Sequence, residues 1–186
     1  APVKDNLLKV AKCKGEKVED LTVVVLDRPR HEQLIKDIRT AGARIKLIPD
    51  GDVAGALMTA MDNNPADLLM GVGGTPEGVL AAVGLRCMGG DIVGKLYPRN
   101  QHEIDKAKEL GIDINKPLLM KDLIASDNVF FAATGITTGD YLRGVDYFKD
   151  GARTDSVVMR GLSGTVRRVI STHKLSKLQR ISAIKY

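Results

Sequence analysis

Short apolar runs alternate with amphipathic segments along the first ninety residues. Residues 21–26 form a β-branched run too continuous to face water on one side, which predicts a central strand, and residues 44–48 and 67–72 predict two more strands. Helical spacing of apolar residues predicts helices at 5–14, 32–41, 53–61 and from the glycine-rich stretch after residue 72 to about Met88. This alternation predicts an α/β fold, a layered sandwich of a mostly parallel sheet with helices on both faces.

The second half of the chain is less regular. The pattern predicts a strand at 91–97, an exposed helix at 101–110, a short apolar segment at 118–124, a buried strand at 128–135 and a turn at 136–140. Residues 157–160 and 165–170 predict an antiparallel hairpin whose turn is bracketed by Gly161 and Gly164. The tail from Lys174 to Tyr186 is basic and fits neither helix nor strand clearly. No repeat or linker divides residues 1–186, which we expect to form a single α/β domain.

Composition narrows the possible functions. With 44% hydrophobic residues, the chain can bury a good core, and no apolar run reaches membrane-spanning length, so we expect a cytoplasmic protein with no membrane partner. The net charge of +5 suits nucleic acid or an anionic small substrate, but only 4% of residues are aromatic, which argues against a base-stacking surface. The cysteines, Cys13 and Cys87, lie on separate predicted helices and are expected to be inert thiols.

The glycine-rich stretch after residue 70 joins a predicted strand to a predicted helix. Gly73 and Gly74 allow a tight turn and close approach of a ligand, Pro76 suits a first helical turn, and Glu77 lies where the helix dipole favours a carboxylate. The stretch matches neither the dinucleotide fingerprint nor the P-loop. An ordinary strand-to-helix turn, with Glu77 only helping the helix to begin, explains this stretch equally well.

Because ligands bind beyond the carboxyl ends of parallel strands, the strand order collects three loops at one edge. The loops are Arg28-Pro29-Arg30, Asp50-Gly51-Asp52 and Gly73 to Glu77. Two guanidinium groups near helix amides make a phosphate site, unless they are solvated or paired with Asp27. Asp50 and Asp52 can accept hydrogen bonds from sugar hydroxyls or help to bind a cation, unless they only cap the helix that follows.

The residues carry no complete catalytic constellation. Glu77 can ligate Mg²⁺ or Mn²⁺, but a single carboxylate makes a poor metal site, and no acidic cluster supplies the others. His31, His102 and His173 lack metal-ligand spacing and are expected at the surface or at helix starts. No nucleophile elbow or Ser-His-Asp order is present. We therefore assign no catalytic residue.

Several motifs together resemble the class II fructose-1,6-bisphosphatases. They are residues 26–31 (Leu-Asp-Arg-Pro-Arg-His), 48–54 (Ile-Pro-Asp-Gly-Asp-Val-Ala), 71–79, 126–128, 133–137, 160–161 and 165–168, in the family's order and spacing. The resemblance implies a metal-dependent phosphatase of the inositol monophosphatase-like superfamily. Such an enzyme removes the 1-phosphate of fructose 1,6-bisphosphate in gluconeogenesis, and some members also accept sedoheptulose 1,7-bisphosphate.

Carried over by position, the resemblance implies a role for each of the three loops. Arg28, Pro29 and Arg30 would bind a substrate phosphate, and Asp50, Gly51 and Asp52 would contact the sugar. Gly74 would touch substrate through its backbone, and Glu77 would ligate the metal, Mn²⁺ or Mg²⁺. The family also suggests a homo-oligomer, either a dimer or a tetramer.

The resemblance covers only about the second half of the family's chain. The family's other metal-binding carboxylates, its threonine-bearing loop and a substrate-contacting tyrosine lie in the first half, and none has a counterpart here. We therefore expect residues 1–186 to be the carboxyl-terminal, substrate-binding part of such an enzyme, inactive without the metal-binding half. One alternative is a domain that only binds phosphorylated sugars. Another, nucleic-acid binding by the basic segment from Arg167 to Arg180, is less favoured.

Overall fold

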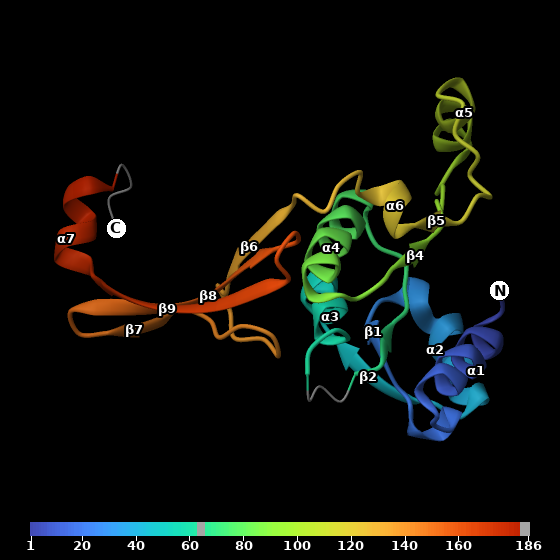
Figure 1. Cartoon of the computed structure of the whole chain (residues 1–186), viewed down its shortest axis with the longest axis horizontal. Coiled ribbons are helices and arrows are strands. Elements are labelled where there is room, and N and C mark those ends of the chain that lie inside the picture. Colours follow the sequence, from blue (N-terminus) through green and yellow to red (C-terminus); the bar gives the residue numbers. More distant parts are fainter. Residues whose placement is uncertain (63–65, 183–186) are drawn as a thin grey trace.

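Two sheets of different kinds organise the chain in the computed structural model, which describes residues 1–62 and 66–182 (Figure 1). A three-stranded parallel sheet lies among the helices of the amino-terminal half. A four-stranded antiparallel sheet follows it in sequence and extends away from those helices.

The parallel sheet has the order β2 (Arg44–Ile48), β1 (Thr22–Leu26), β3 (Leu68–Leu69). β1 pairs with β2 over its whole length, from Thr22 opposite Arg44 to Leu26 opposite Ile48. The predictions for β1 and β2 are confirmed, whereas the third strand is shorter than predicted. The Met70 N–H still donates to the Val24 carbonyl at 3.0 Å, but the chain then leaves the sheet toward the loop that follows β1.

Helices cover both faces of this sheet because β1 is apolar on both sides. Val23 and Val25 share a core with α1 (Val3–Lys14) and α2 (Glu32–Ala41), whereas Val24 and Leu26 share a core with α3 (Asp52–Met58) and α4 (Thr75–Met88). Successive side chains of a strand point to opposite faces, so this division places the two helix pairs on opposite sides. The predicted layering is confirmed for the parallel part of the fold.

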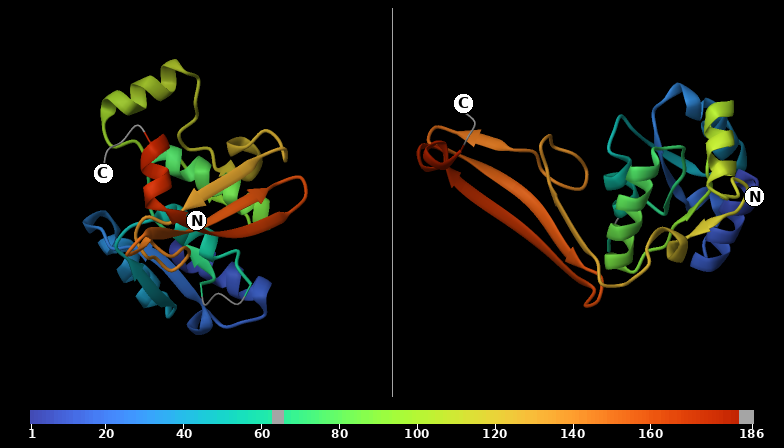
Figure 2. Two further views of the ribbon diagram at one scale, coloured as in Figure 1. Left: turned by 90° about the vertical axis from the view of Figure 1, so that its left-hand side faces the viewer. Right: turned by 90° about the horizontal axis from the view of Figure 1, so that it is seen from above.

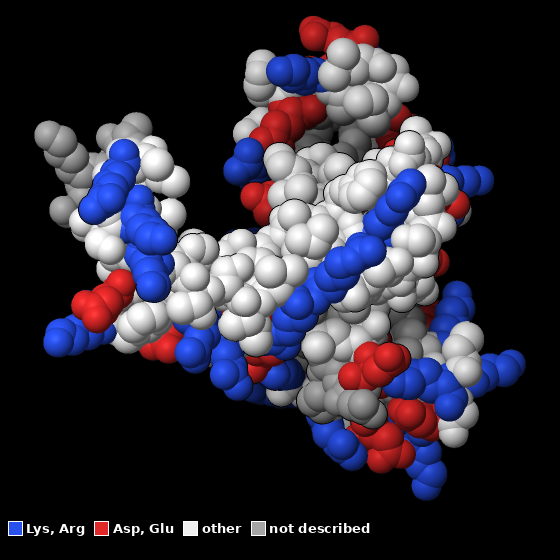
Figure 3. All heavy atoms as spheres, turned by 60° about the vertical axis from the view of Figure 1, so that its left-hand side comes forward, with Lys and Arg blue, Asp and Glu red and all other residues white. Residues whose placement is uncertain are grey.

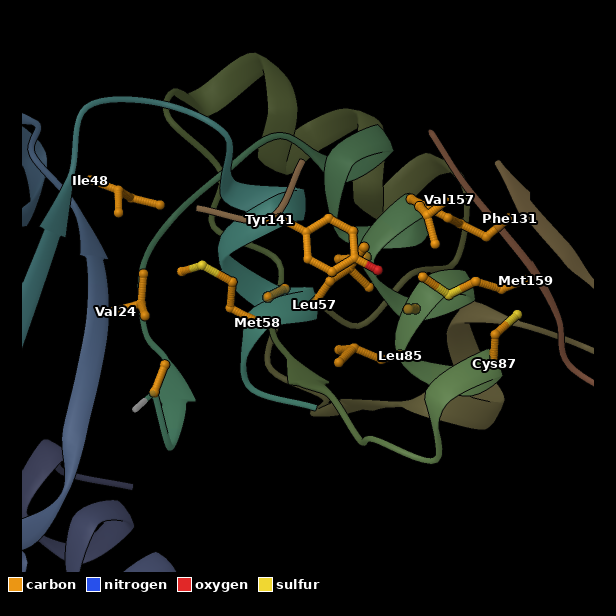
Figure 4. Packing of buried hydrophobic residues seen from close by; sticks show 14 of the residues in the cluster. Val24, Ile48, Leu57, Met58, Leu85, Cys87, Phe131, Tyr141, Val157 and Met159 are labelled. Carbon is orange, nitrogen blue, oxygen red and sulfur yellow. The ribbon is translucent and has the colours of Figure 1, made fainter. Parts of the chain in front are cut away.

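The core that contains Val24 and Leu26 continues from the parallel sheet to the antiparallel sheet. Figure 4 shows Leu57 of α3 and Leu85 of α4 packed between Val24 on one side and Met159 on the other. These side chains are at most 3% exposed. The helices α3 and α4 therefore join the two sheets into one structure.

Helix ends follow the glycine pattern in most places. Gly15 ends α1 with φ of 69° and Gly42 ends α2 with φ of 95°, left-handed conformations that glycine adopts without steric cost. Neither Asp50 nor Asp52 is the N-cap residue of α3, so the alternative in which they only cap this helix is not what the structure shows. The N-cap residue is Gly51, which has a φ of 77° and no side chain to offer.

Short elements connect the two sheets. They are the strands β4 (Val93–Gly94) and β5 (Leu118–Leu119), which pair antiparallel, and the helices α5 (Gln101–Glu109) and α6 (Met120–Leu123). α5 matches the predicted exposed helix and stands away from the other helices (Figure 1). The strand predicted at 91–97 is reduced to two residues. Two 3-10 turns lie within the amino-terminal half instead: η1 (Val18–Asp20) precedes β1, and η2 (Pro29–His31) lies between β1 and α2.

The antiparallel sheet is centred on β8. β8 (Gly151–Arg160) pairs with β6 (Phe130–Thr134) and β7 (Asp146–Phe148) on one edge and with β9 (Thr165–Lys174) on the other. The predicted parallel sheet is therefore confirmed for three strands, whereas the other strands of the described residues lie in separate antiparallel sheets. The predicted hairpin is confirmed but longer, with ten residues in each strand.

The antiparallel sheet packs on the helices with one face only. Phe131 is 7% exposed, whereas its neighbour Phe130 is 64% exposed, so the prediction of a fully buried strand at 128–135 was wrong. Beyond β6, the outer parts of β8 and β9 extend as an arm that carries α7 (Leu175–Ile181) at its end (Figure 2). This helix occupies most of the tail that the sequence left open, and residues 183–186 lie outside the described residues.

An ion pair between the buried Asp155 and the half-exposed Arg168 joins the centres of β8 and β9. Asp155 is 4% exposed and accepts hydrogen bonds from the Arg168 guanidinium, including Nε to Oδ1 at 2.8 Å, and from the Arg143 backbone N–H at 2.9 Å. The Arg168 hydrogen bonds lower the pKa of the Asp155 carboxyl to about 2. The contact with Arg143 also holds the loop between β6 and β7 against the sheet.

Asp155→Asn is expected to lower the free energy of unfolding by about 1.5–3 kcal/mol at pH 7, because it removes charge-assisted hydrogen bonds. The folded-state pKa is lowered, so this stabilisation is present above the ordinary carboxyl pKa of about 4 and is lost as the pH falls toward 2. Urea unfolding of parent and variant between pH 7 and pH 2.5 measures the difference. Asp146→Asn, at an exposed position of the same sheet, serves as the control. A difference that stayed constant over this range would contradict the assignment.

Candidate functional site at the carboxyl edge of the parallel sheet

The three predicted loops meet at one edge of the parallel sheet. Each follows a strand. The arginine loop (residues 27–31) follows β1, the acidic loop (residues 49–52) follows β2, and the glycine loop (residues 70–77) follows β3. The Asp27 N–H donates to the Ile48 carbonyl at 2.9 Å, which joins the first two loops at their bases. The structure therefore confirms that these segments lie together, while the roles predicted for their side chains stay predictions.

The arginine loop presents two guanidinium groups that are held by backbone carbonyls. Arg28 Nη1 donates to the Asp27 carbonyl at 3.0 Å, and Arg30 Nε donates to the Val72 carbonyl at 2.8 Å. Neither arginine forms an ion pair with a carboxylate within residues 1–62 and 66–182. The alternative in which Asp27 neutralises them is therefore not what the structure shows, and their positive charges are available to an anion.

The acidic loop lies beside the glycine loop. Asp52 occupies the first turn of α3, where its Oδ1 accepts a hydrogen bond from the Val53 N–H at 2.9 Å. Its Oδ2 lies so close to the backbone of Gly73 that a Cβ added there would be only 2.8 Å away. Asp50 is exposed one residue before the N-cap. The two carboxylates thus differ, because only Asp52 packs against the glycine loop.

Glycines in the loop after β3 provide space rather than an unusual backbone conformation. Gly74 is the N-cap of α4 with an extended φ of −73°, and Gly73 is not among the glycines with positive φ. The Glu77 carboxylate folds back over Gly74, so a Cβ at that position would overlap Glu77 Oε2. The carboxylates of Asp52 and Glu77 therefore both lie against this loop.

Histidine positions divide between the surface and the interior. His102 is exposed in the first turn of α5, as predicted. His173 is in β9, where its Nε2 lies 3.0 Å from the Thr154 hydroxyl. His31 stands at the start of α2, which agrees with the prediction, but its side chain is buried, with 1% exposed.

The described residues hold no group of three or more His, Cys, Asp or Glu side chains placed to bind one metal ion. Glu77 is exposed at the start of α4, and Asp52 lies against the other glycine of the same loop. Magnesium and manganese need about six oxygen ligands, some of which are water. This part of the chain therefore does not form a complete metal site.

A pocket of about 630 Å³ adjoins the acidic loop on the side away from the arginines. Its walls combine Asp50, Gly51 and α3 with the end of β6 and the loop that contains Tyr141. Burial raises the pKa of the Tyr141 hydroxyl to about 12, so the tyrosine is neutral at physiological pH. The sequence patterns did not assign Tyr141 to a site. Arg28, Arg30 and Glu77 do not line this pocket, which shares only residues of the loop after β2 with the edge where the charged groups lie.

The fold is an α/β domain with arginines, helix-start amides and carboxylates on neighbouring loops at one edge of its parallel sheet. Comparison with known proteins identifies the kind of domain. Residues 1–173 match the family model described as "Bacterial fructose-1,6-bisphosphatase, glpX-encoded". The chain belongs to this family, and the predicted resemblance is confirmed.

Individual relatives agree with the family model. The chain is 41% identical to the class 2 fructose-1,6-bisphosphatase of Haemophilus influenzae over 193 aligned positions, which cover 97% of the chain and 58% of that protein. It is 39% identical to the fructose-1,6-bisphosphatase 1 class 2 of Escherichia coli K12 over 189 positions, which cover 95% of the chain and 56% of that protein. The chain therefore spans a little more than half the length of these relatives. Among the described residues, no helix is long and apolar enough to cross a membrane.

Gly74→Ala is expected to force the Glu77 carboxylate off the loop, because the added Cβ takes its place. The matched control is Gly78→Ala, one turn further along α4, where an added Cβ meets nothing within 4 Å. Gly78→Ala should raise the free energy of unfolding by about 0.5–1 kcal/mol, since alanine favours a helix over glycine. Crystal structures and urea unfolding of the two variants measure both effects. An unmoved Glu77 carboxylate in Gly74→Ala would show that the loop does not require glycine for this reason.

Proposed function

We propose that residues 1–186 bind fructose 1,6-bisphosphate at the carboxyl edge of the parallel sheet, as the substrate-binding part of a class 2 fructose-1,6-bisphosphatase. The complete enzyme would release the 1-phosphate and leave fructose 6-phosphate. The observation that carries this proposal is the meeting of two unpaired arginines, the N-terminus of α4 and two acidic side chains at one edge. The substrate is that of the relatives, which are class 2 fructose-1,6-bisphosphatases.

Phosphate recognition belongs to the arginine loop in this proposal. Arg28 and Arg30 would donate hydrogen bonds to phosphate oxygens, with the Pro29 backbone between them. Because the Val72 carbonyl already binds Arg30 Nε, Arg30 would present its two Nη atoms to the phosphate. Charge-assisted hydrogen bonds of this kind are roughly twice as strong as neutral ones.

Sugar recognition belongs to the acidic loop and to the start of α4. Asp50 and Asp52 would accept hydrogen bonds from sugar hydroxyls, and the Gly51 backbone would lie between them. Gly74 would contact substrate through its backbone at the N-terminus of a 14-residue helix, where free amides favour an anionic or polar ligand. No side-chain carboxylate needs to approach a phosphate in this arrangement.

Glu77 would provide one oxygen to a Mg²⁺ or Mn²⁺ ion in the complete enzyme. Such an ion polarises phosphoryl oxygens and activates water. The described residues lack the further ligands that the ion requires, so we place those ligands in the part of the relatives that the chain does not cover. We assign no step of hydrolysis to this chain and expect no turnover by residues 1–186 alone.

Further properties follow from the proposed function. They are an inositol monophosphatase-like superfamily fold, a place in gluconeogenesis in the cytoplasm, assembly as a homo-oligomer, and activity on sedoheptulose 1,7-bisphosphate as a second substrate. The alternative of a domain that only binds sugar phosphates uses the same loops and differs in lacking turnover.

Nucleic-acid binding has less support. In Figure 3, basic and acidic side chains both lie along the lower edge of the arm, beside a broad uncharged surface, so the basic side chains form no uninterrupted patch on this face.

Arg28→Gln and Arg30→Gln are each expected to weaken binding of fructose 1,6-bisphosphate by about tenfold or more, because each removes charge-assisted hydrogen bonds to phosphate. Titration calorimetry with residues 1–186 measures the affinity. Arg39→Gln, an exposed position at the other end of α2, is the matched control for the loss of one positive charge. Equal weakening in all three variants would indicate that only net charge matters and would count against a built phosphate site.

Residues 1–186 should release no phosphate from fructose 1,6-bisphosphate with Mn²⁺ or Mg²⁺, because the metal site is incomplete. A colorimetric phosphate assay, with the intact mass of the protein checked, tests this expectation. Glu77→Gln is the control, since it removes the proposed metal ligand while keeping the shape of the side chain. Turnover that Glu77→Gln abolishes would show a sufficient metal site in this chain and would overturn the need for further ligands.

A further inference from the structure

A buried histidine joins the arginine loop to the glycine loop. His31 ends the η2 turn that carries Arg30, and its side chain is 1% exposed. The ring bridges two backbone groups from different segments: Nδ1 lies 2.8 Å from the Leu26 carbonyl at the end of β1, and the N–H of Val72, in the loop after β3, donates to Nε2 at 2.9 Å. Both contacts are internal to the protein, and neither is part of the proposed ligand site.

The two partners allow one form of the imidazole. The Leu26 carbonyl can only accept a hydrogen bond, so the proton is on Nδ1. The Val72 N–H can only donate, so Nε2 must keep its lone pair. The neutral tautomer with hydrogen on Nδ1 is therefore the form that satisfies both groups.

Because Gly71 has no side chain, it leaves space for the His31 imidazole beneath the glycine loop. A Cβ added at this position would lie 3.2 Å from Cε1 and 3.3 Å from Nε2 of His31. These separations are tighter than ordinary van der Waals contact, so a side chain here would press on the imidazole and on its hydrogen bond to Val72. The loop backbone and the ring are in direct contact.

Val72 is held through both of its backbone polar groups by neighbouring residues. Its N–H donates to His31, and its carbonyl accepts from Arg30 Nε at 2.8 Å. Together these contacts fix the backbone just before Gly73 and Gly74, and they also orient the Arg30 guanidinium. A change at His31 would thus alter the spacing between the arginine and the amides at the start of α4.

We propose that His31 is a positioning residue for binding of a phosphorylated ligand, acting through Val72 and touching no ligand itself. This inference rests on the proposed function, because it assumes that the arginine loop and the glycine loop bind one molecule. The hydrogen bond from Val72 to Nε2 sets the separation of the two loops, and the bond from Nδ1 to Leu26 anchors the ring to β1.

Two substitutions separate these hydrogen bonds. His31→Gln can place an amide oxygen near the position of Nε2 and keep the acceptor for Val72, while it loses the donor to Leu26. His31→Asn can place an amide nitrogen near the position of Nδ1 and keep the donor to Leu26, while it leaves Val72 without an acceptor. Each variant therefore loses one buried hydrogen bond, but only His31→Asn releases the glycine loop.

The expected result is a difference in binding between variants that are similarly destabilised. His31→Asn should weaken binding of fructose 1,6-bisphosphate by about five- to tenfold, the range of one lost hydrogen bond, and His31→Gln should stay within about threefold of the parent. Hydrogen exchange followed by NMR gives a readout without ligand: the Val72 amide should exchange faster in His31→Asn and remain protected in His31→Gln. His102→Asn, at an exposed histidine, is the control and should change neither quantity.

The outcomes distinguish the positioning role from the proposed function. Equal affinity in the two His31 variants, with Val72 protection lost only in His31→Asn, would overturn the positioning role and leave the proposed function standing. A parent chain that binds neither fructose 1,6-bisphosphate nor inorganic phosphate would overturn the proposed function and the positioning role with it. If His31→Asn does not fold, Gly71→Ala presses on the same contact, and it should weaken binding and Val72 protection together. Unchanged binding in a folded Gly71→Ala with reduced Val72 protection would also overturn the role.

Discussion

The burial of β1 on both faces is the constraint on which the other features depend. A five-residue strand that alternates Val23 and Val25 with Val24 and Leu26 needs helices on both sides. Parallel neighbours satisfy this requirement, because each connection between parallel strands contains a helix that crosses a face of the sheet. The same arrangement brings the carboxyl ends of all three strands to one edge. The site therefore follows from the burial of this strand.

Backbone contacts then convert that edge into a defined surface. The Asp27 N–H continues the pairing with β2 beyond the strand, and Val72 is held by two consecutive residues that follow β1. Side chains pack into the remaining space, with Asp52 over Gly73 and Glu77 over Gly74. Loops usually move more than the strands that they connect. Here each loop is connected to another by at least one hydrogen bond or close contact.

Sequence patterns correctly predicted the elements for which local sequence preference and burial in the tertiary structure favour the same conformation. The bounds of β2 and α2 and the glycine ends of α1 and α2 were right, because burial periodicity and glycine conformation act within a few residues. The burial of His31 was not predicted, because its partners lie on other segments and no local pattern reports them. The length of the arm was underestimated because β9 carries Arg and Thr on both faces, so hydrophobic alternation does not mark its length. The loops of the site were found, but their contacts were not.

The charges at the edge limit how a ligand can lie there. The glycine loop offers backbone amides to an anion, but the Asp52 and Glu77 carboxylates lie against the same two glycines. A phosphate placed directly over this loop would meet two like charges in addition to the amides, and its binding there would be weakened. Arg28 and Arg30 form no ion pair with a carboxylate in the described chain, so the phosphate gains most beside them. The carboxylates are then suited to hydrogen-bond donors and cations. In the proposed arrangement, Asp52 would meet hydroxyl donors and Glu77 would meet a cation. A ligand that carries both phosphate and hydroxyl groups matches this division of charge better than an anion alone.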